Sequence, residues 1–112
     1  MNIQVKLKDC IIIIIENMNF YELSARYDSM QSFYGKAQVA IEDGGKVLYS
    51  YNTKVAKITE DGIVILYSQW DCSGTTLRHV KEFLKQETNF FIEKKKDIEN
   101  LIKENKIIYD TK

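Results

Sequence analysis

The sequence lacks a surplus of charge of either sign. Its 112 residues hold 16 basic and 16 acidic side chains, so the formal net charge is zero. Non-specific nucleic-acid binding needs a basic excess that neutralises phosphates, and this composition does not provide one. A protein that mimics DNA would need an acidic excess, which is missing too. Charge composition therefore indicates neither of these two classes.

Residues that bind metals or act as nucleophiles are scarce. The chain has one histidine, His79, and two cysteines, Cys10 and Cys72, without a Cys-x-x-Cys motif or a histidine pair. A zinc site needs several such ligands close together, so we predict no metal site and no cofactor. A Cys72–His79 pair is the one conceivable nucleophilic dyad, and no third group orients it. We predict no catalytic residues and a protein that is not an enzyme. We expect the two thiols to be reduced, as in a cytosolic protein, with a disulfide as the less favoured alternative.

Long hydrophobic runs are missing as well. The isoleucine run Ile11–Ile15 is far shorter than the roughly 20 residues that cross a bilayer, so no membrane association is expected. Its β-branched side chains favour a buried strand, and alternation over residues 3–7 predicts another. An exposed isoleucine strand would aggregate, so it needs cover from a helix or from a second copy of the chain. A homodimer through this strand is the sharper alternative.

The clearest pattern that is present lies in residues 36–67. Polar and apolar residues alternate from Lys36 to Glu42, and Asp-Gly turn signals follow at 43–45 and again at 60–62. Alternation bounded by such turns is typical of antiparallel hairpins. The strands predicted here cover residues 36–42, 46–51, 54–59 and 63–67.

Residues 19–27 fit two patterns. Alternation gives one apolar face and favours a strand, whereas Phe20, Leu23 and Tyr27 also recur at helical spacing. We take the strand as the prediction and keep the helix as the alternative. Together these segments predict an α+β domain over residues 1–88, with an antiparallel sheet of about 5–6 strands.

A helix is predicted at about 75–87, where it covers the sheet. The hydroxyl of Thr75 or Thr76 is expected to cap its first amides, because such side chains accept hydrogen bonds from free N–H groups. Leu77, Val80 and Leu84 recur on one side of this helix. The side chains expected to face water are Arg78, Lys81, Glu82 and Lys85, with His79 at the border.

A second helix is predicted at about 90–106, within a C-terminal helical extension over residues 89–112. Its apolar stripe is thin and is interrupted by Lys94 or Lys95. Such a stripe suits weak docking on the domain, pairing with a copy of itself, or binding to another protein. The tail from Tyr109 to Lys112 is expected to fray.

Aromatic residues crowd the predicted sheet region. Core packing and cross-strand pairing are the ordinary explanation. Tyrosine and tryptophan are also enriched in binding hot spots, which favours a recognition surface flanked by basic side chains. The partner-binding residues that we predict are Tyr34, Lys36, Tyr51, Lys54, Trp70 and Arg78.

Three blocks of sequence carry a family resemblance: Tyr27–Ala37, Leu48–Ile58 and Thr75–Gln86. Their order and spacing resemble a family of small uncharacterised proteins of phages and mobile elements of gram-positive bacteria. The resemblance covers roughly residues 20–87, and none of the blocks is a catalytic signature. It implies a cytoplasmic protein in a bacterial host cell. Small proteins from that setting often bind and block a host defence, including CRISPR nucleases.

Two functional hypotheses follow. The favoured one is a non-enzymatic binding protein that inhibits a host protein or ribonucleoprotein; its specific form is an anti-CRISPR that acts on a Cas nuclease complex. The alternative is a nucleic-acid-binding accessory protein whose sheet aromatics stack bases beside Lys36, Lys54 and Lys57. The sequence leaves direct nucleic-acid binding open.

Overall fold

A computed structural model describes residues 20–111 of the chain. In that range the chain forms six strands and two α-helices. They are β1 (Phe20–Glu22), β2 (Ala37–Glu42), β3 (Gly45–Ser50), β4 (Thr53–Ile58), β5 (Val64–Tyr67), α1 (Gly74–Glu87), α2 (Lys95–Lys103) and β6 (Ile108–Asp110). The predicted α+β class is confirmed. Three predictions lie outside the described residues: the strand at 3–7, the isoleucine strand at 10–15 with the homodimer through it, and a disulfide to Cys10.

The strands form one sheet whose spatial order, β1 to β6, follows the chain. Neighbours from β1 to β5 are antiparallel, and β6 runs parallel to β5. Both central hairpins close through two residues in the left-handed region. These are Asp43 and Gly44 after β2, with φ of 52° and 80°, and Tyr51 and Asn52 after β3, with φ of 51° and 70°. This turn geometry matches the natural twist of paired strands, so it fixes their register.

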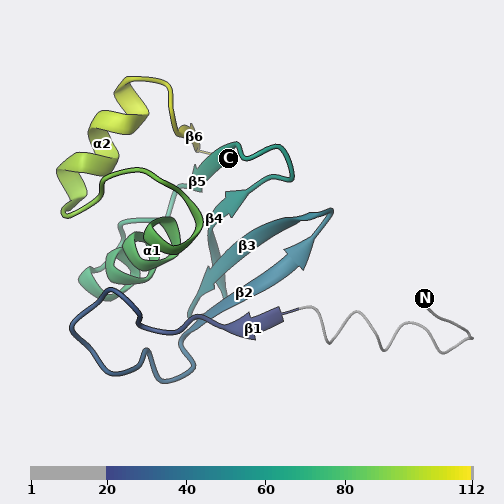
Figure 1. The fold of residues 1–112 in the computed structure, drawn as a ribbon, viewed down its shortest axis with the longest axis vertical. Helices are drawn as coiled ribbons and strands as arrows, with labels where there is room; N and C mark the ends of the chain where they lie inside the picture. The colour runs from purple at the N-terminus through teal and green to yellow at the C-terminus, as the bar shows by residue number, and fades with distance from the viewer. Residues whose placement is uncertain (1–19, 112) are drawn as a thin grey trace, which may run out of the picture.

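Helix α1 lies against one face of the sheet, and α2 lies beyond it toward β5 and β6 (Figure 1). Side chains from the sheet and both helices share one buried core, and burial of each large apolar side chain contributes about 1.5–3 kcal/mol. Its members include Val39, Leu48, Val55 and Leu66 from the sheet, Val80, Phe83 and Leu84 from α1, and Ile98 from α2.

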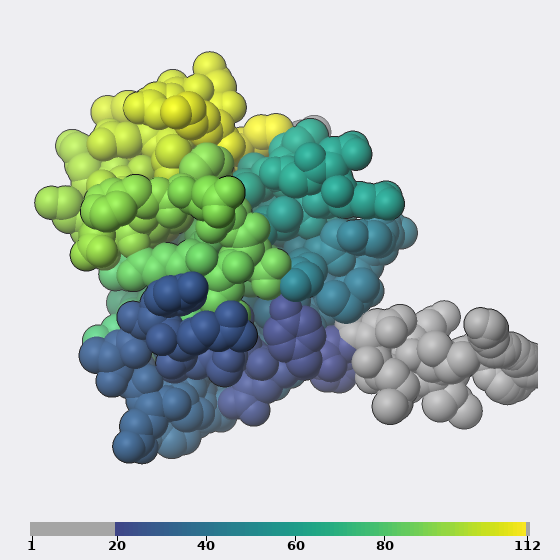
Figure 2. Space-filling view, in the orientation of Figure 1, coloured from purple at the N-terminus to yellow at the C-terminus, as the bar shows by residue number. Residues whose placement is uncertain are grey.

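The segment predicted as a strand over residues 19–27 is a strand only at Phe20–Glu22. The amides of Arg26, Tyr27 and Asp28 donate to the Glu82 carboxylate on α1 instead of to a neighbouring strand. That contact turns the chain away from the sheet and toward the helix. Figure 2 shows the dark blue segment after β1 against the green surface formed by α1 and the residues that follow it.

The C-terminal part differs from the prediction in two ways. The helix expected at 90–106 covers only Lys95–Lys103, because the Asp97 carboxylate accepts the amides of Glu93 and Lys94 and so fixes a later start. Tyr109 and Asp110, at the start of the tail expected to fray, instead belong to β6, beside β5. Ile107 is buried in the core directly before β6, which holds this strand at the sheet edge.

Candidate binding cleft

A cleft of about 190 Å³ brings together four of the six residues predicted to contact a partner. The loop between β1 and β2 contributes one wall, the turn after β3 contributes the second, and the start of α1 contributes the third. The four predicted residues are Tyr34, Lys36, Tyr51 and Arg78, and the cleft also has Met30, Phe33, Thr75 and His79 in its lining.

Both tyrosines at the cleft have a backbone that bulky residues rarely adopt. Their φ angles are 53° at Tyr34 and 51° at Tyr51, in the left-handed region. Such a conformation costs of order 1 kcal/mol or more, so surrounding contacts must impose it. The Tyr34 amide donates to Ser32 Oγ at 2.8 Å, and the Tyr51 amide donates to the Lys36 carbonyl at 2.9 Å. The two side chains are 70% and 51% exposed, so the backbone presents both rings to solvent.

His79 lies inside the cleft and is fully buried, not at the border of α1 as predicted. The Phe33 ring meets the imidazole edge-on, with centroids 4.7 Å apart, and the Tyr51 ring lies at 5.9 Å. Imidazole Nδ1 is 2.8 Å from Ser50 Oγ, whereas Nε2 has no hydrogen-bond partner among residues 20–111. Burial lowers the pKa of His79, although the charge of Asp28 opposes that shift. The imidazole is therefore neutral at pH 7.

A buried chain of hydroxyl groups runs from the surface to His79. Ser50 Oγ is 3.0 Å from Thr76 Oγ1, which also accepts hydrogen bonds from Ser73 Oγ at 3.2 Å and from Cys72 Sγ at 3.7 Å. Ser73 also accepts the Thr76 amide at 3.1 Å and so caps α1. The cap was predicted at Thr75 or Thr76, which is two or three residues too late. The Thr76 amide is itself one of the helix amides that need a cap, and Ser73 supplies it.

Two cations lie at the edge of the cleft. Lys36 Nζ is 5.7 Å from the centre of the Tyr51 ring, within cation–π range. Arg78 Nε is 3.8 Å from Asp28 Oδ2, and the Arg78 side chain remains about half exposed. The Asp28 side chain is only 12% exposed, but the contact is long and the half-exposed guanidinium can still reach another anion.

Glu82 anchors the loop that forms one wall of the cleft. It was predicted to face water, yet it is 2% exposed. Its carboxylate accepts the amides of Tyr27 and Asp28 at 2.9 Å and that of Arg26 at 3.1 Å. Gln86 Nε2 donates to the same carboxylate and to the Ser24 carbonyl. These contacts compensate for the burial of the charge, so Glu82 fixes the loop onto α1.

Trp70 and Lys54, two of the predicted contact residues, do not line this cleft, and neither does Cys72. Trp70 is 4% exposed and packs in the core, with Lys95 Nζ 6.0 Å from its ring. Lys54 lies over the Tyr67 ring at 5.1 Å. Cys72 reaches Thr76 but does not contact His79, so the two do not form a direct nucleophile–base pair. Within the part of the chain that the structure describes, no group of three potential metal ligands occurs.

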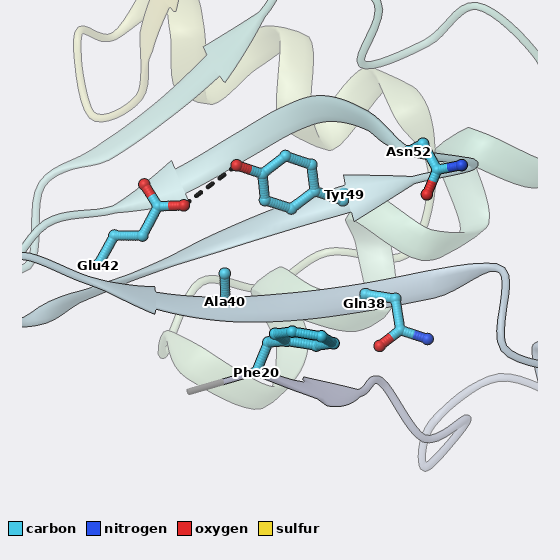
Figure 3. Close-up of a pocket in the computed structure, with 6 residues that line it drawn as sticks. All are labelled: Phe20, Gln38, Ala40, Glu42, Tyr49 and Asn52. Atoms are coloured by element: carbon cyan, nitrogen blue, oxygen red, sulfur yellow. Dashed lines mark hydrogen bonds between the residues drawn. The ribbon is translucent and has the colours of Figure 1, made fainter. Parts of the chain in front are cut away.

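A second hollow of about 310 Å³ lies on the face of the sheet opposite α1 (Figure 3). Phe20 from β1, Ala40 from β2 and Tyr49 from β3 line it, with Glu42 at one end. The Tyr49 hydroxyl donates to Glu42 Oε2 at 3.1 Å, and burial together with this bond raises the pKa of Tyr49. The acidic side chain of Glu42 in the hollow disfavours phosphate groups, so this face is a weaker candidate for a nucleic-acid site.

His79 was predicted at the border of its helix, although the sequence contains a signal that it is buried. Thr76, His79, Val80 and Phe83 recur at i, i+3, i+4 and i+7, the spacing of a buried helical stripe. That spacing places Thr76 and His79 beside the core. The inward position of Glu82 has no comparable signal, because the amides it binds are more than 50 positions away.

Comparison with known proteins identifies a family and nothing further. A family model with the description "Family of unknown function (DUF8033)" matches residues 21–100. No curated protein matches the chain, and no solved structure does. Across residues 20–111, neither helix is long and apolar enough to cross a membrane.

Proposed function

The chain belongs to this family of unknown function, and we propose that it is a non-enzymatic binding protein whose recognition surface is the cleft around His79. The observation that carries the proposal is the convergence of two presented tyrosines, two cations and a buried neutral histidine in one hollow. Tyrosine and arginine are the side chains on which binding energy concentrates at protein interfaces.

The size of the cleft indicates a large partner rather than a metabolite. Pockets that enclose a small molecule usually have about 300–1,000 Å³, whereas this one has about 190 Å³. It therefore suits a single group that protrudes from a macromolecule. The rings of Tyr34 and Tyr51 at its mouth would contact the surface around that group.

We propose further that the partner is a host macromolecule and that binding inhibits it, as expected for a cytoplasmic protein of a phage or mobile element. A Cas nuclease complex is the first partner to test. This part of the proposal rests on the resemblance described above. The three blocks that carry the resemblance contribute the three walls of the cleft: Tyr34 and Lys36 come from the first, Tyr51 from the second, and Arg78 and His79 from the third.

The test compares capture of host proteins by two variants. Tyr34→Asn combined with Tyr51→Asn removes both rings, while asparagine tolerates the left-handed backbone at each position. The matched control is Phe91→Ala, which removes a ring that is 76% exposed and lies outside the cleft. Each hot-spot ring is worth about 2 kcal/mol, so the partner retained by the control should bind the double variant at least 30-fold more weakly. Equal affinity for the two variants would remove the cleft as the recognition surface.

The nucleic-acid alternative has its own test. Titration of the wild-type protein with a bare oligonucleotide at two salt concentrations measures the number of phosphates neutralised. We expect no steep salt dependence. Lys36 lines the cleft, whereas Lys54 lies over the Tyr67 ring and outside the cleft, so the cleft does not gather both lysines. Tight binding with a steep salt slope would favour the nucleic-acid function instead.

A further inference from the structure

We propose that the cleft is a receptor for a carboxylate group and that His79 Nε2–H is its buried hydrogen-bond donor. The proposal rests on the proposed binding function and names the chemistry of the group that the partner inserts. The group is an acidic side chain or the C-terminal carboxylate of a protein.

We infer the tautomer of His79 from the buried chain of hydrogen bonds that leads to it. Thr76 Oγ1 accepts from Ser73 Oγ and from Cys72 Sγ, which uses its two lone pairs. Its own proton is therefore directed to Ser50 Oγ, 3.0 Å away. The Ser50 proton is then directed to His79 Nδ1, 2.8 Å away. Since Nδ1 accepts, the single proton of the neutral ring is on Nε2.

The Nε2–H group is a donor that the described chain leaves without an acceptor. His79 is fully buried and Nε2 lies in a residue that lines the cleft. Buried polar groups are almost always hydrogen-bonded, because an unmet donor loses its contact with water and gains nothing in return. Because Nε2 is inaccessible to water, an acceptor restores this bond when its entry into the cleft displaces the atoms that cover Nε2.

The side chains around the donor select an anion with a short apolar stem. Lys36 and Arg78 supply two positive charges at the edge against the one acidic side chain of Asp28, which favours a charged acceptor over a neutral carbonyl. Phe33 and Met30 supply apolar surface beside it, against which one or two methylene groups would pack. An acidic side chain has both parts in this order.

The loop backbone argues for a carboxylate over a phosphate. Phosphate sites in proteins usually use several free backbone amides. Here the amide of Tyr34 donates to Ser32, that of Gly35 donates to Glu22 Oε2 at 2.9 Å, and that of Lys36 donates to the Phe33 carbonyl. With those amides engaged, the cleft offers one imidazole N–H and two cations, which suits the two oxygens of a carboxylate.

The first experiment uses the wild-type protein with a ¹⁵N-labelled imidazole. Nuclear magnetic resonance of the free protein should show the proton on Nε2. Titration with acetate, a probe for an acidic side chain, and with N-acetylglycine, a probe for a chain terminus, should shift the Nε2 resonance to saturation. Acetamide, the uncharged analogue of acetate, should not. A proton on Nδ1, or an inorganic phosphate affinity equal to that of both carboxylates, would overturn the proposal.

The second experiment uses a matched pair of substitutions. His79→Gln places an amide N–H near the position of Nε2, whereas His79→Asn reaches only the position of Nδ1. Tyr34 amide resonances report binding in each. We expect acetate affinity to fall at least 10-fold more in His79→Asn than in His79→Gln, with both folded by thermal unfolding. Equal affinities would contradict the donor role. If acetate binding fails while the tyrosine variants still lose the partner, the carboxylate proposal fails and the binding function stands.

Discussion

Helix α1 carries two buried polar side chains that differ in how fully the protein satisfies them. Glu82 and His79 are both almost completely inaccessible to solvent, and they lie three positions apart. The Glu82 carboxylate accepts three backbone amides and a glutamine side chain, whereas His79 makes one hydrogen bond, to Ser50. A saturated buried group stabilises the fold, while a half-satisfied one retains capacity for a ligand. The comparison separates the structural region of the helix from the recognition region.

The largest effect is expected when the saturated group is removed. Glu82→Ala leaves the amides of Arg26, Tyr27 and Asp28 without their acceptor, and such losses cost about 1–3 kcal/mol each when the donors remain buried. Because part of the loop becomes hydrated, we expect the free energy of unfolding to fall by about 3 kcal/mol in urea titrations. Glu82→Gln keeps one acceptor oxygen and should lose about half as much. A loss below about 1 kcal/mol for the alanine variant would show that Glu82 is not an anchor.

Removal of the His79 imidazole should have little effect on the free energy of unfolding. His79→Phe replaces the imidazole with an apolar ring and removes the donor that lacks a partner, so the cost is limited to the bond with Ser50. We expect a change in unfolding free energy of about 1 kcal/mol or less, together with loss of carboxylate binding. A destabilisation as large as that of Glu82→Ala would show that His79, like Glu82, serves mainly to stabilise the fold.

Acidification sharpens the comparison, because it adds a proton to the buried imidazole of His79. Burial lowers the pKa of His79 from 6.5, with Asp28 opposing the shift and Lys36 and Arg78 also facing the cleft. The unfolded chain therefore binds the proton at higher pH than the folded one. The contribution of the neutral His79 to the free energy of unfolding is fully present above about pH 6.5 and declines as the pH falls below that value. Urea midpoints at about pH 7.5 and about pH 5.5 should differ in wild type and converge in His79→Phe. If the urea midpoint changed equally with pH in both proteins, groups other than His79 would be the cause of the pH dependence.

The smallest effect is expected at the Lys46–Glu87 pair, in which a charged glutamate on the same helix has a partly exposed partner instead of buried amides. Lys46 Nζ lies 2.9 Å from Glu87 Oε2, and this hydrogen bond raises the pKa of Lys46. Both side chains remain partly in water, where such pairs contribute about 0–1 kcal/mol. Lys46→Met should therefore change the unfolding free energy by less than about 1 kcal/mol, and added salt should reduce the difference. A salt-independent loss above that size would show that the pair is effectively buried.

The sequence predicted the features that depend on local pattern. The Asp-Gly turns and the alternating strands over residues 36–67 were placed correctly to within about one residue, because turn chemistry and side-chain alternation act over short distances. The helix covering the sheet was also found, since its apolar stripe is continuous.

The features missed depend on contacts between distant segments. Glu82 looks like an exposed helix residue until the loop after β1 folds back onto it. β6 has only three residues and pairs in parallel with β5, so its place follows from where α2 ends and not from its own sequence. For the cleft, the aromatic and basic residue types indicated Tyr34, Lys36, Tyr51 and Arg78, but they did not separate these from Trp70, whose ring is in the core.

The left-handed backbone at Tyr34 and Tyr51 has a kinetic consequence. Hydrogen bonds and turn geometry fix the backbone that carries the two rings before any partner arrives, so complex formation requires little reordering of this backbone. A surface of this kind meets its target at an ordinary encounter rate, and differences in affinity between variants then arise from how long the complex persists. Substitution of either tyrosine should therefore shorten the residence time of the complex more than it slows association.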